Sequence, residues 1–300
     1  MISEKYVSNL QFGMPTLIEL NSIRENVELC KELGLHFVEL NMNMPYCTIL
    51  GCSEKNNSDV ENFIKELTNL KNEFGIYFTI HIDENFNFAD FNSYVKEAYY
   101  QTIKSVIENA KKIHCPILNM HINHGIYFTL PTEKVFLFKK YNQKYMNDVL
   151  VFSSLCQNKI ENNVENENQI LPKVVIENTD GWKDFEKVAI NKFLENSNFG
   201  LTFDIGHSES IGNVDEEFIL ENKNKLFHFH IHDGTLPDEK TKSYGKNHLT
   251  LGSGKINLEE RLNLAKECNG RCVIETKTVD SLRKSVEWLK DNKYFEKKIN

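Results

Sequence analysis

Residues 199–233, FGLTFDIGHSESIGNVDEEFILENKNKLFHFHIHD, contain a strand, a helix and a second strand in succession. Phe199–Asp204 and Leu226–His232 are short apolar runs of strand length, and Val214–Glu221 between them has the pattern of an amphipathic helix. Parallel strands need such a crossover, because a tight hairpin joins only antiparallel neighbours. This stretch therefore predicts a parallel sheet covered by helices.

The same alternation recurs along the chain in eight cycles. The predicted strands are Val7–Gly13, His36–Asn41, Tyr77–Ile82, Ile117–Ile122, Val174–Asn178, Phe199–Asp204, Leu226–His232 and Arg271–Glu275. The predicted helices are Ser22–Leu33, Ser58–Phe74, Phe91–Ile113, Thr132–Gln157, Trp182–Glu195, Val214–Glu221, Leu258–Glu267 and Val279–Lys290. Eight such units predict a single (β/α)8 TIM barrel domain over residues 1–300, with an open doubly wound sheet as the alternative, because sequence does not show closure.

Composition narrows the class of protein. A net charge of -8 gives no overall basic surface for nucleic acid or anionic membranes, so such partners are disfavoured. The chain shows no secretory leader and no run of roughly 18 apolar residues, so we expect a cytoplasmic protein. Its seven scattered cysteines form no CxxC pair and are interpreted as reduced thiols. The polar stretch at residues 158–169, NKIENNVENENQ, predicts a surface insertion.

Metal-binding residue types recur where the predicted strands end. In a parallel barrel these ends share one face, which is the face that carries active sites. Each residue alone has an ordinary structural explanation, but ionised carboxylates gathered at one mouth repel one another and need a cation. The six residues are His81, His121, Glu177, Asp204, His230 and Glu275.

Other residues near this mouth are weaker candidates. Period-two alternation in the strand Leu226–His232 directs three histidines, at 228, 230 and 232, into the barrel, where the one nearest the mouth ligates most easily. Asp204 and His207 flank a tight bend at Gly206 and can reach one cavity. His248 lies in a glycine-flanked loop. Tyr127 either walls a substrate pocket or packs its loop, and Lys246 either binds a phosphate or is solvated.

The chain resembles the xylose-isomerase-like barrel superfamily, which includes sugar isomerases, ketose 3-epimerases and type IV apurinic endonucleases. The resemblance spans nearly the whole chain and rests on VVIEN, FDIGH, HIHD, NHLTLGSGKIN and VIET in this order, beginning at residues 174, 203, 230, 247 and 273. For the epimerases it implies a metal held by Glu177, Asp204, His230 and Glu275, with His207 touching substrate. It also implies that Glu177 and Glu275 are the catalytic proton-transfer pair.

The endonuclease branch offers a second interpretation, because its additional zinc ligands resemble His81, His121, His207 and His248. The chain departs from that branch at Lys246, where the branch has an aspartate ligand. It departs again after His81, where Asp83 and Glu84 replace an apolar pair and would repel phosphates. A full trinuclear zinc cluster is therefore disfavoured.

The leading hypothesis is a divalent-metal-dependent isomerase or epimerase of a small sugar or sugar phosphate. The alternatives are a zinc-dependent phosphodiesterase or apurinic endonuclease-like hydrolase, and a non-catalytic barrel that binds sugar or metal. Three carboxylates and one imidazole favour Mn²⁺, with Zn²⁺, Co²⁺ or Mg²⁺ as alternatives. The sequence leaves open the substrate, the choice between epimerisation and aldose-ketose exchange, the roles of His228 and His232, and whether the chain forms a homo-oligomer.

Overall fold

The computed structural model describes residues 6–8, 10–53, 58–162, 169–238, 240 and 243–297. Eight parallel strands close into a barrel whose spatial order follows the chain. They are β2 (Gln11–Pro15), β3 (Phe37–Asn41), β4 (Tyr77–His81), β5 (Ile117–His121), β8 (Lys173–Glu177), β9 (Phe199–Asp204), β10 (Leu226–Ile231) and β11 (Arg271–Ile274). β11 pairs with β2, so the predicted (β/α)8 barrel is confirmed and the open sheet is wrong.

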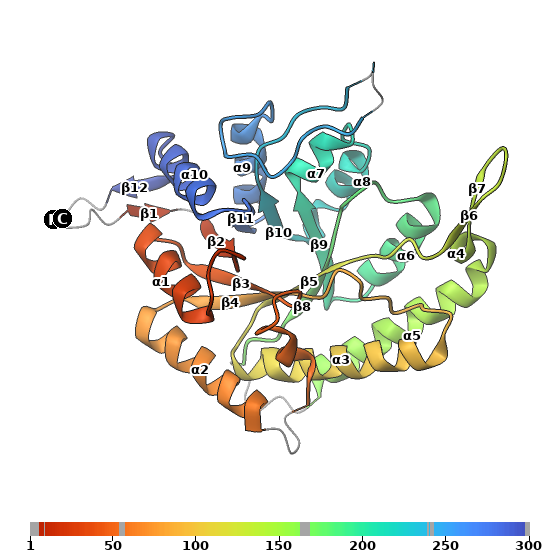
Figure 1. Ribbon diagram of the computed structural model, residues 1–300. Helices are drawn as coiled ribbons and strands as arrows, with labels where there is room; N and C mark the ends of the chain where they lie inside the picture. The colour runs from red at the N-terminus through yellow and green to blue at the C-terminus, as the bar shows by residue number, and fades with distance from the viewer. Residues whose placement is uncertain are drawn as a thin grey trace.

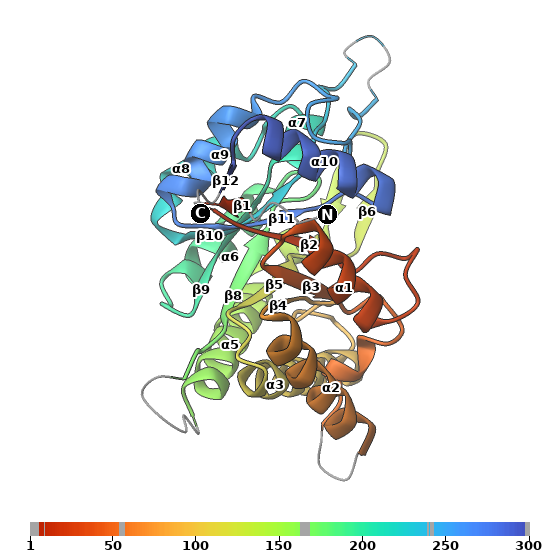
Figure 2. The ribbon, with the colours of Figure 1, turned by 90° about the vertical axis from the view of Figure 1, so that its left-hand side faces the viewer.

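Helices surround the barrel on its outer side (Figures 1 and 2). They are α1 (Ile23–Leu33), α2 (Ser58–Phe74), α3 (Ser93–Lys112), α4 (Leu137–Lys140), α5 (Asn142–Glu161), α6 (Asp184–Leu194), α7 (Ile205–Ser210), α8 (Glu216–Glu221), α9 (Leu258–Glu267) and α10 (Val279–Asp291), with 3-10 turns η1 (Thr48–Gly51) and η2 (Lys223–Lys225). Local sequence sets their ends. Ser22 caps α1 by accepting the Glu25 N–H, and Gly34 ends it in the left-handed region, at φ 79°. Among the described residues no helix combines the length and apolarity needed to cross a bilayer.

Strand alternation separates the apolar core from the polar barrel interior. On β10, Phe229 and Ile231 are buried and belong to the hydrophobic core between barrel and helices. The intervening His228 and His230 are also fully buried, and both contact Glu39 of β3 inside the barrel. Each strand thus contributes to the core with one face and to the barrel interior with the other.

Two predicted elements are wrong. Instead of one strand at Val7–Gly13, the chain forms β1 (Tyr6–Ser8), which pairs antiparallel with β12 (Phe295–Lys297), and then β2. The start of the predicted helix Thr132–Gln157 belongs to an antiparallel hairpin of β6 (Tyr127–Thr129) and β7 (Lys134–Phe136). Pro131 lies in its turn, where the Leu130 N–H donates to the Glu133 carbonyl at 2.8 Å, and proline favours such a turn over a helix interior.

The polar stretch predicted as an insertion at residues 158–169 is partly helical. Its first residues continue α5 to Glu161, and residues 163–168 lie outside the described part of the chain. The predicted boundary at residue 158 is therefore wrong, and the surface insertion itself stays a prediction.

Candidate metal centre

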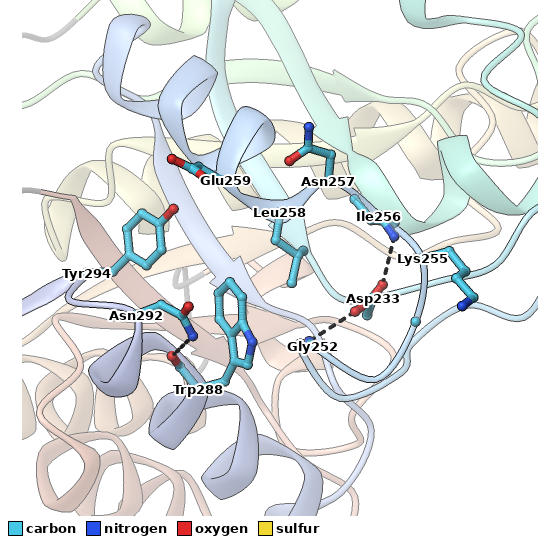
Figure 3. A pocket seen from close by; sticks show the side chains of 11 residues that line it. Asp233, Gly252, Lys255, Ile256, Asn257, Leu258, Glu259, Trp288, Asn292 and Tyr294 are labelled. Atoms are coloured by element: carbon cyan, nitrogen blue, oxygen red, sulfur yellow. Dashed lines mark hydrogen bonds between the residues drawn. The ribbon is translucent and has the colours of Figure 1, made fainter.

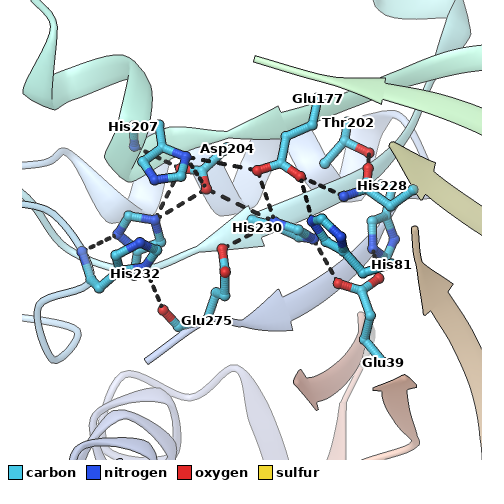
Figure 4. Close-up of polar contacts among 12 residues, drawn as sticks. Glu39, His81, Glu177, Thr202, Asp204, His207, His228, His230, His232 and Glu275 are labelled. Carbon is cyan, nitrogen blue, oxygen red and sulfur yellow. Dashed lines mark hydrogen bonds and ion pairs between the residues drawn. The ribbon is translucent and has the colours of Figure 1, made fainter. Parts of the chain in front are cut away.

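The carboxyl ends of the barrel strands bring the predicted site residues together (Figure 4). His81, His121, Glu177 and Asp204 are the last residues of β4, β5, β8 and β9, whereas His230 is the penultimate residue of β10 and Glu275 directly follows β11. Parallel strands direct these ends to one face of the barrel. Glu177 lies 3.3 Å from each of His81, His121 and His230, and His230 lies 3.1 Å from Glu275. Asp204 belongs to the same group of possible metal ligands as Glu177, His230 and Glu275.

Glu177, Asp204, His230 and Glu275 form the centre of this cluster. One ligand atom of each lies within 4.8 Å of the other three. His230 Nδ1 is 3.3 Å from Glu177 Oε1, 3.1 Å from Glu275 Oε2 and 3.9 Å from Asp204 Oδ2. The resemblance-based ligand set is therefore spatially coherent, with an imidazole nitrogen facing three carboxylates.

The electrostatics of this group require compensating positive charge. Burial alone would raise the pKa values of Glu177 and Glu275, but the neighbouring His230 holds both well below their ordinary range. Burial would likewise lower the pKa of His230, yet Glu177, Glu39 and Glu275 raise it well above its ordinary value. Burial would raise the pKa of Asp204 as well, but His207 and His232 hold it below its ordinary value, so ionised carboxylates surround the ring of His230. A divalent ion at Nδ1 would supply more positive charge than the proton that it displaces.

Unpartnered polar atoms show that the donor set fits a metal ion. Within the described part of the chain, His230 Nδ1 and Glu275 Oε2 are buried without a hydrogen-bond partner, as are His121 Nε2 and His207 Nδ1. Buried polar atoms normally have partners, so such a gathering needs an explanation. Three carboxylate oxygens and one imidazole nitrogen form a ligand set suited to Mn²⁺, Mg²⁺ or Co²⁺.

Glu39 lies beneath this centre and was not predicted. Its side chain is buried, and Oε2 accepts hydrogen bonds from Thr79 Oγ1 at 3.0 Å and His228 Nε2 at 2.8 Å. Oε1 is 2.8 Å from His230 Nε2, a contact that counts as an ion pair and not as a hydrogen bond. A carboxylate on Nε2 leaves Nδ1 of His230 facing the ligand group. The sequence feature that could have identified Glu39 is its position as a charged residue inside the predicted strand His36–Asn41.

His81 and His121 contact Glu177 at Oε2, whereas His230 contacts it at Oε1. The Nε2 atom of each is 3.3 Å from Glu177 Oε2, and His81 Nδ1 lies 2.8 Å from the Ile82 carbonyl. A carbonyl can only accept, so His81 Nδ1 carries a proton. Burial alone would lower the pKa of His81, but Glu177 raises it to about 9, so Nε2 is protonated toward Glu177 in the metal-free protein and would offer a lone pair only once an ion displaces that proton. The amide of Asn119 also donates to Glu177 Oε2. His81, Glu177 and His230 accordingly form a second group of possible ligands.

His207 and His248 lie at the outer side of the centre, close to His232. His207 Nδ1 is 3.0 Å from Asp204 Oδ2, and its backbone N–H donates to Asp204 Oδ1 at 2.6 Å. His248 Nδ1 is 3.1 Å from the Glu275 carbonyl, and burial lowers the pKa of His248 to about 4, so its ring stays neutral. Possible ligand atoms of His207, His232 and His248 lie within 4.8 Å of one another.

Two weaker candidates lie apart from these contacts. Lys246 is exposed, and its backbone N–H donates to Thr235 Oγ1 at 2.9 Å. Tyr127 is in the β6–β7 hairpin, 46% exposed, with Lys134 Nζ 4.8 Å from its ring centroid. A lysine that was not predicted does reach the centre: Lys277 Nζ is 2.8 Å from Glu275 Oε1.

Asp233 holds the loop that carries His248. Its Oδ1 accepts the backbone N–H groups of Gly234 at 2.8 Å and Ile256 at 3.2 Å, and its Oδ2 accepts the Gly252 N–H at 3.0 Å (Figure 3). A Cβ at Gly254 would lie 2.2 Å from Asp233 Oδ1, so only glycine fits there. Asp233 therefore fixes the NHLTLGSGKIN loop beside the centre rather than joining the ligands.

Comparison with known proteins agrees with this architecture. Residues 27–292 match the protein family described as xylose isomerase-like TIM barrel. A curated relative, the uncharacterized protein MJ1311 of Methanocaldococcus jannaschii, is 25% identical over 300 residues, covering 96% of this chain and 90% of the relative.

Solved structures share the fold at lower identity. A D-tagatose 3-epimerase-like protein is 22% identical with a TM-score of 0.68, covering 94% of this chain and 96% of its own. Endonuclease IV from Thermus thermophilus is 14% identical with a TM-score of 0.61, covering 94% and 99%. An IOLI protein with a binding zinc atom is also 14% identical, with a TM-score of 0.65 and coverage of 95% and 98%. These likenesses concern the fold and leave the reaction to be inferred from the site.

Proposed function

The chain belongs to the xylose isomerase-like TIM barrel family, and on this basis we propose that it is a divalent-metal-dependent isomerase or epimerase of a small sugar or sugar phosphate. One observation carries the proposal. Glu177 of β8 and Glu275 after β11 approach the same imidazole nitrogen, His230 Nδ1, at 3.3 and 3.1 Å. Two carboxylates on either side of one ligand group are the arrangement that proton transfer across a bound sugar needs.

The proposed metal ligands are Glu177, Asp204, His230 and Glu275, with Mn²⁺ preferred over Zn²⁺, Co²⁺ or Mg²⁺. A divalent ion there would act as a Lewis acid that polarises the carbonyl oxygen of the sugar. His207, which lies beside Asp204, is a proposed substrate contact. Lys246 and Tyr127 stay proposed contacts from the loop and the hairpin.

The two glutamates would exchange protons with the sugar. One ionised carboxylate takes the proton from the carbon beside the carbonyl, while the C–H electron pair forms a C=C bond and the carbonyl oxygen gains negative charge. The other glutamate, which has to take up a proton from solvent before this step, then gives that proton to carbon, and the electrons return. The first glutamate ends protonated and the second ionised, and exchange with solvent restores both. Addition from the opposite face inverts the carbon.

Solvent exchange provides the test of this reaction. Protein loaded with Mn²⁺ is incubated in D₂O with a panel of ketoses, aldoses and their phosphates, and deuterium beside the carbonyl is measured by NMR. We expect exchange with at least one sugar and none with the Glu177→Gln or Glu275→Gln variant. Ligand binding without turnover that both variants leave unchanged would favour the non-catalytic alternative. Cleavage of abasic DNA with no exchange on any sugar would contradict the proposal.

A second candidate function rests on Glu177 Oε2. Its 3.3 Å distances to His81 Nε2 and His121 Nε2 suit a second ion that shares Glu177 with the first, as in a hydrolase with paired metals. The fold likeness to endonuclease IV is compatible with this interpretation. The net charge of -8 disfavours a nucleic-acid substrate, and the exposed Lys246 stands where the endonuclease branch has an aspartate ligand. Both features favour the isomerase instead.

Metal stoichiometry separates the two functions. Elemental analysis and anomalous scattering of protein purified without added metal give the number and identity of bound ions together. The isomerase needs one ion at the group of Glu177, Asp204, His230 and Glu275. Two ions about 3.5 to 4 Å apart would favour the hydrolase.

A further inference from the structure

His232 lies between two features of the candidate metal centre, the ligand Asp204 and the loop that carries His248. Its ring is fully buried. The ring centroids of His232 and His248 are 4.2 Å apart, and those of His232 and His207 are 5.4 Å apart. By proximity alone His232 could be a third metal ligand with these two histidines, or it could serve another purpose.

The hydrogen bonds of its ring decide between these roles. The backbone N–H of His248 donates to His232 Nδ1 at 2.7 Å. The Asp233 carbonyl is also 3.3 Å from Nδ1, but a proton on Nδ1 would collide with the amide hydrogen of His248. Nδ1 is therefore an unprotonated acceptor, and the neutral ring carries its proton on Nε2.

A protonated Nε2 points at Asp204. It is 3.0 Å from Asp204 Oδ1 and 3.2 Å from Oδ2, so the ring donates to this carboxylate. The backbone N–H of His207 also donates to Oδ1, at 2.6 Å. The hydrogen bond from the ring goes to Oδ2, which also lies 3.9 Å from His230 Nδ1 and 3.0 Å from His207 Nδ1, so His232 holds the oxygen that faces the ligand group. Since Nδ1 serves the amide and Nε2 has no lone pair, His232 has no atom free to ligate.

We infer that His232 is a positioning residue, which transmits the placement of the His248 loop to the metal ligand Asp204. The loop end of this connection is rigid, because Asp233 accepts the Gly252 N–H and the Ile256 N–H. The other side of the ring is fitted to Gly206, where a Cβ would lie 1.9 Å from His232 Cε1. The inference rests on the proposed metal centre.

The test measures metal binding rather than turnover. Mn²⁺ affinity by isothermal titration and metal per chain at saturation are compared for wild type, His232→Phe and His232→Gln. We expect His232→Phe to weaken binding about 10- to 100-fold with unchanged stoichiometry, the range found when partners of metal ligands are removed. His232→Gln should recover part of the loss, because its amide can still donate to Asp204. Gly206→Ala, which displaces the ring, should weaken binding in the same direction.

A matched control is His36→Phe, which removes a half-buried histidine preceding β3, at the other end of the barrel. It should alter stability but not Mn²⁺ affinity. ¹⁵N NMR of the ring nitrogens in metal-free wild type should show Nε2 protonated and Nδ1 bare, a result that does not depend on any variant folding.

Three outcomes would overturn the inference: the opposite tautomer, an unchanged affinity in His232→Phe, or the loss of one whole metal equivalent in that variant, which would make His232 a ligand. Failure of wild type to bind any divalent ion would instead contradict the proposed metal centre. The two failures are therefore distinguishable.

Discussion

The two halves of the barrel mouth contribute different chemistry. The half formed by β8 to β11 supplies Glu177, Asp204, His230 and Glu275, whose ligand atoms lie within 4.8 Å of one another. The half formed by β3 to β5 supplies groups that contact these ligands from outside, namely Glu39, His81, Asn119 and His121. In the proposed function, the first half would determine whether a dication binds. The second half would orient these ligands, and whether it also holds an ion would distinguish the proposed isomerase from the alternative hydrolase.

The largest expected effect is in the β8–β11 half. Glu177→Gln and Glu275→Gln should each lower the rate of deuterium exchange at least about 10³-fold, because each removes a proton-transfer group and a proposed metal ligand. Loading each variant with excess Mn²⁺ separates the two contributions. If either variant, saturated with metal, exchanged at the wild-type rate, its glutamate would not be a proton-transfer residue.

His81 and His121 test the other half. We expect wild type and the double variant His81→Asn, His121→Asn to retain the same single equivalent of metal, with exchange reduced by no more than about 10-fold, since neither residue belongs to the four-ligand group. Elemental analysis after extensive dialysis measures this. Two equivalents in wild type and one in the double variant would move the assignment to the paired-metal hydrolase.

Glu39 should have a smaller effect, exerted through His230. In Glu39→Gln the side chain can still accept at Oε1, so the loss should be small. We expect Mn²⁺ affinity to fall about 10-fold, the lower end of the roughly 10- to 100-fold losses found when partners of metal ligands are changed. Thr79→Val is the matched control, because Thr79 donates only to Oε2. An equal loss in both variants would show that packing around the carboxylate, and not its contact with His230, is what matters.

The same two halves differ in how far the sequence predicts them. Glu177, Asp204 and Glu275 end apolar runs and lie in ordered motifs, so residue type and position suffice to place them together. Glu39 has no such mark, because a carboxylate inside a strand resembles an ordinary exposed residue, and its partner His228 is 189 residues away. The tautomer of His232 depends on a backbone amide contributed by a distant loop, which residue type does not report.

The fold shows a parallel contrast. The barrel strands are buried on both faces, and seven of the eight were located from sequence, whereas β2 (Gln11–Pro15) overlaps only the end of the predicted strand Val7–Gly13. β1 and β12 have three residues each and show no periodicity. In the β6–β7 hairpin, Tyr127, Phe128 and Leu130 are 46% to 58% exposed, so apolar residues there mark neither a core strand nor a core helix.

The smallest expected effect concerns His124, which joins the two halves. It follows β5, and its ring nitrogens lie 2.5 Å from Glu186 Oε1 and 2.6 Å from Asp180 Oδ1, both beyond β8. Hydrogen bonds to Asp180 and Glu186 raise the pKa of His124 to about 9. Because the folded pKa exceeds the ordinary 6.5, the stabilisation is complete below about pH 6.5 and is lost as pH rises through about 9.

His124→Gln should therefore lower the free energy of unfolding by only about 1 kcal/mol at pH 6, since solvent screens the half-exposed Asp180, and by almost nothing at pH 10. Urea denaturation of metal-free wild type and variant at both pH values gives this difference, with changes common to both chains cancelling. A deficit that persisted at pH 10 would mean that His124 joins the two halves by packing against Phe136, at a ring distance of 6.2 Å, and not by its charge. Loss of this charge-dependent link should leave Mn²⁺ affinity unchanged, because neither carboxylate that it holds belongs to the four-ligand group.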